Sequence, residues 1–384
     1  MPRTWHEPAA AARVQVAILK DWRALRPYEP AVDALHRATG TPVTARLAWW
    51  YSAAMANRGA VPVLLTRRGP GGTLRAAALV ALREQNGGWQ VTSVRPGTDD
   101  VWEVAAVSAG ARRTVLEGLA RFVRGLGCSW QLALTGLSNG DDAAWLAGQL
   151  PAGRALPAPP VPGIGFTPGE VRFAPGIRSG LDRSGHRIRQ HALTETIQFE
   201  REPARLAKLR DEIETVHRAR DHDAGRVSDL DRAAGTAFWR SIYDLHAASG
   251  ELEVATLRLD GQLAAYVVAL VDPPVYRVFD GRFAPSWRRY SPGRRLEAAV
   301  IDHARRGSFG ILDWMSSVAP EKLVASTWAE PRWAVTAAAE PQPALAGTDQ
   351  PVLATAAGPR PVVGAADPVL TVAGGGLPRT AAGP

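Results

Sequence analysis

The chain has 384 residues, of which 46% are hydrophobic and 21% are charged. Because single domains mostly hold roughly 100–200 residues, a chain of this length and composition is expected to bury more than one core, which excludes a fully disordered protein. The formal net charge is +8, and only three of the 45 basic residues are lysines. Such an arginine bias, beside abundant Ala, Gly and Pro, is typical of a GC-rich coding sequence, so the charge alone does not indicate nucleic-acid binding.

The cysteine content and the apolar segments exclude further classes of protein. Cys128 is the only cysteine, which excludes an intramolecular disulfide framework and a zinc or iron–sulfur site built on several cysteines. The first 22 residues carry five charged side chains and lack the apolar core of a signal peptide. The longest apolar run, over residues 263–271, is shorter than the roughly 20 residues that cross a bilayer. We therefore expect a cytoplasmic protein without a membrane partner.

Residues 1–150 are expected to form a first domain that combines helices with a short antiparallel meander. Helical spacing of apolar residues predicts three helices, over residues 10–25, 30–38 and 45–58. Runs of strand-forming residues, broken by a Gly-Pro-Gly-Gly turn, predict three strands, over residues 61–66, 74–82 and 89–94. A helix and a strand follow, over residues 112–126 and 130–134.

Residues 151–183, rich in Pro and Gly, are expected to link this domain to a second one that spans residues 184–334. The second domain begins with two predicted helices, over residues 202–220 and 233–249. Three strands follow, over residues 253–259, 263–270 and 275–279, and the turn Asp260-Gly261 joins the first two into a hairpin. A helix and a strand complete the domain, over residues 291–306 and 309–314.

The order helices, antiparallel meander, helix, strand therefore occurs twice along the chain. This repetition predicts an α+β fold of two tandem domains, although the two halves share no sequence that can be aligned by eye. Residues 335–384 are rich in Ala, Pro, Gly and Val and poor in charge, so we predict a disordered tail there.

The most informative segment spans residues 252–322. Its hairpin turn is followed by Ala264-Ala265, by Tyr276, by the run Phe-Ala-Pro-Ser-Trp-Arg-Arg-Tyr-Ser-Pro-Gly over residues 283–293, and then by Leu296, Gly307, Asp313 and Lys322. This pattern resembles the two-domain CelD-like (cellulose-biosynthesis-type) acetyltransferases of the GNAT superfamily, which are related to the Fem-type aminoacyl transferases. The resemblance implies two tandem GNAT-like domains, each with a mixed, largely antiparallel sheet flanked by helices, of which the second carries the acyltransferase site.

The resemblance also implies acetyl-CoA or another acyl-CoA as donor substrate, bound where residues 283–293 enter a helix. The N-terminus of a helix presents unpaired N–H groups and a partial positive charge to a phosphate. Ser291 is expected to cap this helix, and Pro292 fits its first position. The donor-binding residues predicted are Arg288, Arg289, Ser291, Gly293 and Arg294. The alternative is an ordinary capped surface helix with solvated arginines.

Acyl transfer requires that the acceptor amine loses a proton and that the leaving group gains one. Asp313 is the candidate that orients or deprotonates the acceptor, with a helix cap or an ion-pair partner as its alternative role. Lys322 would stabilise developing negative charge, and Tyr276 is either a proton donor or a core aromatic. The predicted function is transfer of an acyl group to an amine or hydroxyl of a small molecule or polymer, in a cleft between the halves. No metal is expected to take part.

The sequence departs from the family pattern at four positions, namely Ala284, Ser317, Ala319 and Glu321. These departures leave an aminoacyl-tRNA or a carrier-protein pantetheine arm as alternative donors, because each presents phosphate and an activated ester. A non-catalytic GNAT-like binding protein is a further alternative. The first half has no Ser-Pro-Gly loop before its last helix, so we expect it to be a degenerate copy that serves as a scaffold.

Two other motifs point to different chemistry. Residues 136–140 read Gly-Leu-Ser-Asn-Gly and fit the nucleophile elbow of a serine hydrolase, with Ser138 as nucleophile. A hydrolase of that kind needs a long parallel sheet, whereas a helix cap by Asn139 or Asp141 explains the same residues. His217 and His222 offer metal-type side chains but fall on different faces of a predicted helix. Acidic residues interleaved along that helix favour a solvated face over nucleic-acid binding.

Overall fold

A computed structural model of the protein describes residues 14–57, 59–94, 102–166, 175–307, 309–315 and 326–339. Its elements fall into two series that repeat one another. The first series consists of β1 (Val14–Ile18), η1 (Trp22–Tyr28), α1 (Glu29–Thr39), η2 (Val43–Ala45), α2 (Leu47–Ala56), β2 (Val61–Arg68), η3 (Pro70–Gly72), β3 (Leu74–Gln85), β4 (Gly88–Thr92), β5 (Ala105–Ala106), α3 (Ala109–Arg124), β6 (Trp130–Leu137), α4 (Gly140–Gly148) and β7 (Arg154–Gly165).

The second series repeats this order of strand, helices, antiparallel meander, helix and strand. It consists of α5 (Pro175–Gln190), β8 (Glu195–Glu200), α6 (Pro203–Asp223), η4 (Asp229–Asp231), α7 (Ala233–Ala248), β9 (Leu252–Leu259), β10 (Gln262–Asp272), β11 (Val275–Phe283), η5 (Pro285–Tyr290), α8 (Pro292–Arg306), β12 (Ile311–Asp313) and β13 (Trp328–Ala338). The predicted α+β class and the duplicated order are therefore confirmed.

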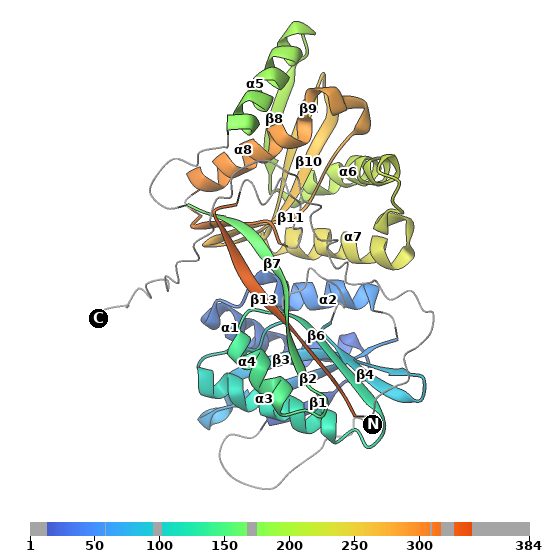
Figure 1. Ribbon diagram of the computed structural model, residues 1–384, viewed down its shortest axis with the longest axis vertical. Coiled ribbons are helices and arrows are strands. Elements are labelled where there is room, and N and C mark those ends of the chain that lie inside the picture. The colour runs from blue at the N-terminus through green and yellow to red at the C-terminus, as the bar shows by residue number, and fades with distance from the viewer. Residues whose placement is uncertain are drawn as a thin grey trace, which may run out of the picture. The chain divides into compact units, whose positions relative to one another are not determined.

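The strands form one mixed sheet in the order β1-β2-β3-β4-β6-β13-β7-β12-β11-β10-β9-β8, and β5 pairs with β3. Each half contains one parallel pair at the same place in its series, β4 with β6 and β11 with β12. The last strand of each half pairs with the other half, because β13 lies between β6 and β7 while β7 also pairs with β12. Figure 1 shows β7 and β13 running together between the two groups of elements.

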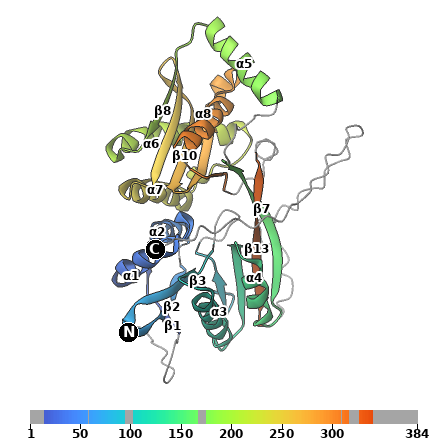
Figure 2. The ribbon, with the colours of Figure 1, turned by 90° about the vertical axis from the view of Figure 1, so that its left-hand side faces the viewer.

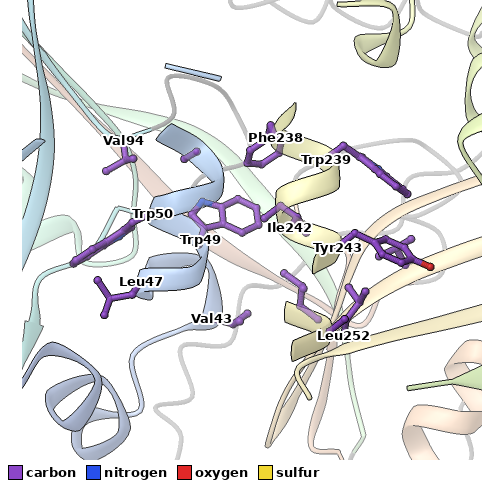
Figure 3. Close-up of a cluster of buried hydrophobic side chains, with 14 of the residues drawn as sticks. Val43, Leu47, Trp49, Trp50, Val94, Phe238, Trp239, Ile242, Tyr243 and Leu252 are labelled. Atoms are coloured by element: carbon purple, nitrogen blue, oxygen red, sulfur yellow. The ribbon is translucent and has the colours of Figure 1, made fainter. Parts of the chain in front are cut away.

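The helices cover both faces of the sheet. Figure 2 shows α1 and α2 on one side of the first-half strands and α3 and α4 on the other. In the second half, α6 and α7 cover the face of β9, β10 and β11 that continues the face of α1 and α2, and α8 covers the opposite face. Helices α2 and α7 contact each other, and Figure 3 shows Trp49 of α2 and Phe238 of α7 in the cluster between them. The Trp49 ring packs edge-on against Phe238 and Phe279 at ring distances of 5.7 and 5.8 Å. One apolar cluster thus spans both halves.

The hairpin between β9 and β10 shows how local sequence sets the fold. Asp260 and Gly261 both have positive φ, at 48° and 79°, as a tight two-residue turn requires. The strand that follows is buried from Leu263 to Asp272, as expected of a strand with helices on both faces. The predicted hairpin is confirmed.

Three predictions about organisation are wrong. Residues 10–25 do not form a helix over the part described, because residues 14–18 pair with β2 as an edge strand. Residues 151–183, expected to be a linker, contain β7 and the first part of α5. The predicted tail begins too early, because β13 extends to Ala338. Residues 340–384 of the predicted tail lie outside the described residues.

The prolines of β7 explain why this strand was hard to predict. Pro157, Pro159 and Pro160 lie where β7 pairs with β13 on one side only, because β12 reaches β7 only at residues 163–165. A proline is tolerated in a strand whose N–H side has no partner, so the composition of a linker coexists with a place in the sheet. No helix among the described residues has the length and apolar character needed to span a membrane.

The exchange of strands predicts how truncation affects folding. A chain that ends at residue 326 lacks β13 and leaves both β6 and β7 without their shared partner. We expect it to lose the cooperative unfolding transition, whereas a chain that ends at residue 340 keeps the melting temperature of the full-length protein. Circular dichroism during thermal unfolding measures both, and a cooperative transition in the shorter chain would contradict the structural role of β13.

Candidate functional site

The parallel pair of the second half opens into an unpaired strand edge. β11 and β12 are paired only from Val275 to Arg277 and from Ile311 to Asp313. Beyond Arg277, β11 continues to Phe283, and among the described residues nothing pairs with its β12 side. A bulge at Phe279 interrupts the pairing of β11 with β10 at this level, and bulges often occur beside active sites. Within the part of the chain that the structure describes, this edge of β11 has no strand partner from Val278 onward.

The beginning of α8 lies next to the end of β11. A Cβ atom added to Gly293 would come within 3.3 Å of the Phe283 ring, so the glycine allows a close approach. Pro292 occupies the first helical position, as predicted. Ser291 precedes it, but its side chain makes no capping hydrogen bond, because its backbone is left-handed (φ 51°) rather than extended as in an ordinary cap. The expected cap is therefore wrong, and the first N–H groups of α8 carry no side-chain cap.

The predicted donor-binding residues come together at this helix start. Arg288 and Arg289 lie on η5 and Arg294 on the first turn of α8, and all three are exposed. Arg288 forms an ion pair with Asp223 of α6, and the Arg289 guanidinium lies 4.7 Å from the centre of the Tyr290 ring. The neighbouring arginine, at position 295, is instead committed to Glu195 of β8 and ties α8 to that strand. The site thus presents three exposed cations around an uncapped helix end.

Asp313 lies at the end of β12 with only 2% of its surface exposed. One carboxylate oxygen pairs with the Arg277 guanidinium, and the other accepts a hydrogen bond of 2.6 Å from the Met315 N–H. Arg277 also faces Asp272 at 3.5 Å, and Asp272 in turn pairs with Arg46 of the first half. Asp313 therefore belongs to a chain of buried ion pairs that joins the halves.

Tyr276 lies on the opposite face of the sheet from Asp313. It is fully buried, and its hydroxyl donates a hydrogen bond of 2.5 Å to Glu253. Glu253 also contacts Arg201 at 2.7 Å and His303 at 3.0 Å. Burial, together with the Glu253 carboxylate, raises the pKa of Tyr276 well above its usual value. The structure does not bring Tyr276 and Asp313 to one place, and Lys322 lies outside the described residues.

A buried polar network under α6 was missed by the sequence analysis. His217 contacts Asp221 at 3.1 Å and Asp280 at 3.2 Å, and Tyr266 donates to Asp280 at 2.7 Å. Although burial opposes ionisation, Arg282 and the hydrogen bonds from His217 and Tyr266 hold the pKa of Asp280 well below its usual value. These contacts fix α6 to β11 one residue beyond the bulge. No local sequence motif links these residues. The bulge beside Asp280 depends on how β10 and β11 pair, which the sequence alone does not show.

Glu330 of β13 was also missed, because the sequence around it carries no motif. Its side chain is 36% exposed and pairs with Arg332 at 2.9 Å. Burial raises the pKa of Glu330 above its ordinary value of 4.5, and the carboxylates of Asp313 and Glu103 add to this effect against the opposing charges of Arg332 and Arg277. Glu330 is thus a half-exposed carboxylate in the middle of the sheet.

The other motifs have structural partners. Ser138 donates a hydrogen bond to Glu103, and Asn139 caps α4 by accepting from the Asp142 N–H at 3.1 Å. A small cavity lies beside them, against the first turns of α3. His222 contacts Asp231 at 2.7 Å, away from His217. Within the described residues, no group of three or more His, Cys, Asp or Glu side chains could hold a metal ion.

The ion pair of Asp313 predicts a large effect on stability. We expect Asp313→Asn to lower the free energy of unfolding by about 3 kcal/mol, because it removes the closest partner of a buried guanidinium. The matched control is Asp302→Asn on α8, whose partners Arg305 and Arg306 are exposed, and it should cost less than about 1 kcal/mol. Urea unfolding measures both, and equal small losses would contradict a structural role for the Asp313 pair.

Comparisons with known proteins agree with this geometry. Residues 177–323 match the family model described as an acetyltransferase (GNAT) domain. No curated protein sequence gives a significant match to the chain. The structure of FemX is similar with a TM-score of 0.55 and 9% identity, over 80% of this chain and 95% of FemX. The C-terminal domain of a candidate lysylphosphatidylglycerol synthetase from Agrobacterium fabrum is similar with a TM-score of 0.51 and 14% identity, over 80% of this chain and 92% of that one.

A conserved protein of unknown function from Bacteroides thetaiotaomicron has a TM-score of 0.53 and 9% identity, over 80% of this chain and 97% of its own. At these identities the similarity concerns the fold alone. The family model covers α8, β11 and β12, the elements that build the open edge and the uncapped helix start. Residues 177–323 therefore match a GNAT-type acetyltransferase domain, and they lie in a duplicated α+β fold.

Proposed function

We propose that the protein is an acyltransferase that moves an acyl group, acetyl in the simplest case, from acyl-CoA to an amine or hydroxyl of a small molecule or polymer. The observation that carries the proposal is the uncapped start of α8, which lies inside the matched GNAT domain beside the open edge of β11. The finer assignment to the CelD-like branch rests on the sequence run over residues 283–293.

In this proposal the phosphates of the donor bind at the start of α8. The N–H groups of Gly293 and Arg294 point out of the helix end, where the helix dipole adds positive charge. Arg288, Arg289 and Arg294 supply cations that can form charge-assisted hydrogen bonds with phosphate oxygens. The residues present therefore fit a diphosphate group. A side chain at position 293 would crowd this place, because its Cβ meets the Phe283 ring.

The open edge of β11 can hold the extended arm of the donor. From Val278 onward, its backbone N–H and C=O groups on the β12 side make no backbone hydrogen bond within the described residues. An extended amide-bearing chain can pair with such an edge as an added strand would. The acceptor nitrogen or oxygen then attacks the thioester carbonyl, a new C–N or C–O bond forms, and the C–S bond breaks. The leaving thiolate takes up a proton.

In this proposal, two of the three predicted catalytic residues have a structural role instead of a catalytic one. Both oxygens of Asp313 are engaged, so we assign it the positioning of β12 against β11 rather than proton transfer. Tyr276 is enclosed on the α8 face and holds Glu253, so we assign it a supporting role. Lys322 remains a predicted stabiliser of negative charge, as it lies in the matched domain.

The first half serves as a scaffold in this proposal. Its helix α3 corresponds to α8, but Ser108 closes its N-terminus by accepting a hydrogen bond of 3.2 Å from the Ala111 N–H. An occupied helix end has fewer free donors for a phosphate. The absence of a Ser-Pro-Gly loop in the first half is in line with this difference.

An aminoacyl-tRNA or carrier-protein donor is the alternative. The fold similarity to FemX supports a relation to the Fem-type transferases that the sequence resembles. Exposed Arg183 and Arg189 of α5 add to the cations near the start of α8, because α5 packs against η5 through Ser184 and Arg187. These residues could extend a phosphate-binding surface beyond a single diphosphate.

Thermal unfolding with acetyl-CoA tests the proposal. A ligand at about 100 times its dissociation constant stabilises the fold by about 2.7 kcal/mol, so we expect a clear rise in melting temperature. Gly293→Asp should abolish this rise, because a carboxylate at the helix start repels phosphate and its Cβ crowds the Phe283 ring. The same negative charge suits the helix dipole, which favours the helical state of α8. The matched control is Gly110→Asp at the second position of α3, which has open space around it and should keep the rise.

The outcomes separate the candidate functions. Loss of the rise in Gly293→Asp alone supports a donor site at α8, and loss in Gly110→Asp alone would move the donor to the first half. Absence of a rise with acetyl-CoA and with longer acyl-CoAs would overturn the CoA donor. In that case, binding of an aminoacyl-tRNA measured by filter retention decides whether the Fem-type alternative holds.

A further inference from the structure

A small cavity lies in the first half, between the end of β6 and the start of α3. It holds about 310 Å³, part of which is open to solvent. Its walls come from the segment before β5, from the first turns of α3 and from the start of α4, and they include four buried apolar residues, Trp102, Val104, Leu116 and Leu137. This volume is at the lower end of the range for small-molecule sites, so the cavity suits a small ligand with an apolar part.

Glu103 brings a partly buried carboxylate to this cavity. One of its oxygens, Oε1, accepts a hydrogen bond from the hydroxyl of Ser138 in the Gly-Leu-Ser-Asn-Gly motif, which fixes the direction of the group. The other oxygen, Oε2, has no hydrogen-bond or ion-pair partner among the residues that the structure describes. A charge beside apolar walls is costly unless a group of opposite charge pairs with it. Glu103 therefore offers a charge-assisted hydrogen bond to a ligand amine.

Arg112 brings the opposite charge to the same cavity. Its guanidinium group is 38% exposed and comes within 3.7 Å of Asp142, which is beyond hydrogen-bond distance. Asp142 accepts its hydrogen bond from Arg113 instead, and the Arg113 guanidinium lies 4.3 Å from the centre of the Trp145 ring. Within the described part of the chain, Arg112 donates no hydrogen bond, so its N–H groups can bind a ligand carboxylate.

The two opposite charges line one cavity without pairing. Glu103 and Arg112, both of which the structure describes, form no ion pair with each other. The space between them therefore fits a ligand that presents an ammonium group to one and a carboxylate group to the other. A phosphate group fits less well, because the carboxylates of Glu103 and Asp142 repel it.

We propose that this cavity binds a small α-amino acid with an apolar side chain. Glu103 binds the ammonium group, Arg112 binds the carboxylate, and the apolar walls contact the side chain. The cavity lies at the start of α3, the counterpart of α8, so the first half holds a ligand site of its own at a place similar to the proposed donor site. This inference goes beyond the proposed acyltransferase function and does not depend on it.

Three probes with the same apolar body separate the contributions of the two charges. L-Leucine carries both charged groups, isopentylamine carries only the ammonium group, and isocaproate carries only the carboxylate. The readout is the NMR signal of the Trp102 indole N–H, because Trp102 lines the cavity and this N–H is held by the Leu79 carbonyl at 2.9 Å. Comparison with Trp102→Phe assigns the signal.

We expect leucine to shift the Trp102 signal until the site is saturated. Isopentylamine and isocaproate should each bind with a dissociation constant about 10-fold higher or more, because each lacks one charge-assisted hydrogen bond. Glycine keeps both charges but lacks the apolar body, so its dissociation constant should also be about 10-fold higher or more.

Two variants test which residue binds which group. Glu103→Gln keeps an acceptor for the Ser138 hydroxyl but removes the negative charge, so it should weaken leucine binding about 10-fold or more without weakening isocaproate binding. Arg112→Gln should weaken leucine binding to a similar extent without weakening isopentylamine binding. The matched controls are Glu117→Gln and Arg124→Gln, at exposed positions of α3 that do not line the cavity, and they should change none of these dissociation constants.

Several results would overturn the amino-acid site. They are a Trp102 signal that leucine leaves unchanged, equal affinity for leucine and the two single-charge probes, and unchanged leucine binding in both Glu103→Gln and Arg112→Gln. Acetyl-CoA that shifts the Trp102 signal and competes with leucine would also overturn it, because the cavity would then belong to the donor. Each of the first three results leaves the proposed acyltransferase function standing, since that function is tested at Gly293.

Discussion

The exchange of the last strands between the halves is the constraint on which the rest of the structure depends. β13 lies between β6 and β7, and β7 lies between β13 and β12, so neither half completes its own sheet. This pairing fixes the register of four strands in the centre. The position of β11 and its open edge relative to the first half follows from this register rather than from any loop. Rigid strands hold a site more accurately than loops do.

A row of buried charges accompanies this exchange. Arg46 of the first half contacts both Glu251 and Asp272, and Asp272 leads through Arg277 to Asp313. Burying such groups costs desolvation, and an apolar row would often be at least as stable. A charged row, however, tolerates only one register, because a shift of one residue would leave each charge unpaired. The ion pairs therefore select the alignment of the halves more than they add to its stability.

The sequence predicted those features that depend on neighbouring residues. The turn at Asp260-Gly261, the proline at the start of α8 and the cap at Asn139 follow from local conformational preference, and the structure confirms each. β7 and β13 could not be predicted, because their composition is that of a linker and a tail, and they become strands only through partners far away in the chain. Glu330 and the His217 network share this dependence on distant partners, which no local motif reveals.

The difference between α3 and α8 explains how a duplicated fold can carry one donor site. Both helices follow the meander of their half and begin near the carboxyl end of a parallel pair. Ser108 closes the first, whereas the left-handed backbone of Ser291 leaves the second open, so two serines in similar places have opposite effects. A closed helix end stabilises its own half. The open end forgoes that stabilisation, and the neighbouring ties of Arg295 to Glu195 and of Ser184 to the Tyr290 carbonyl hold α8 in place instead.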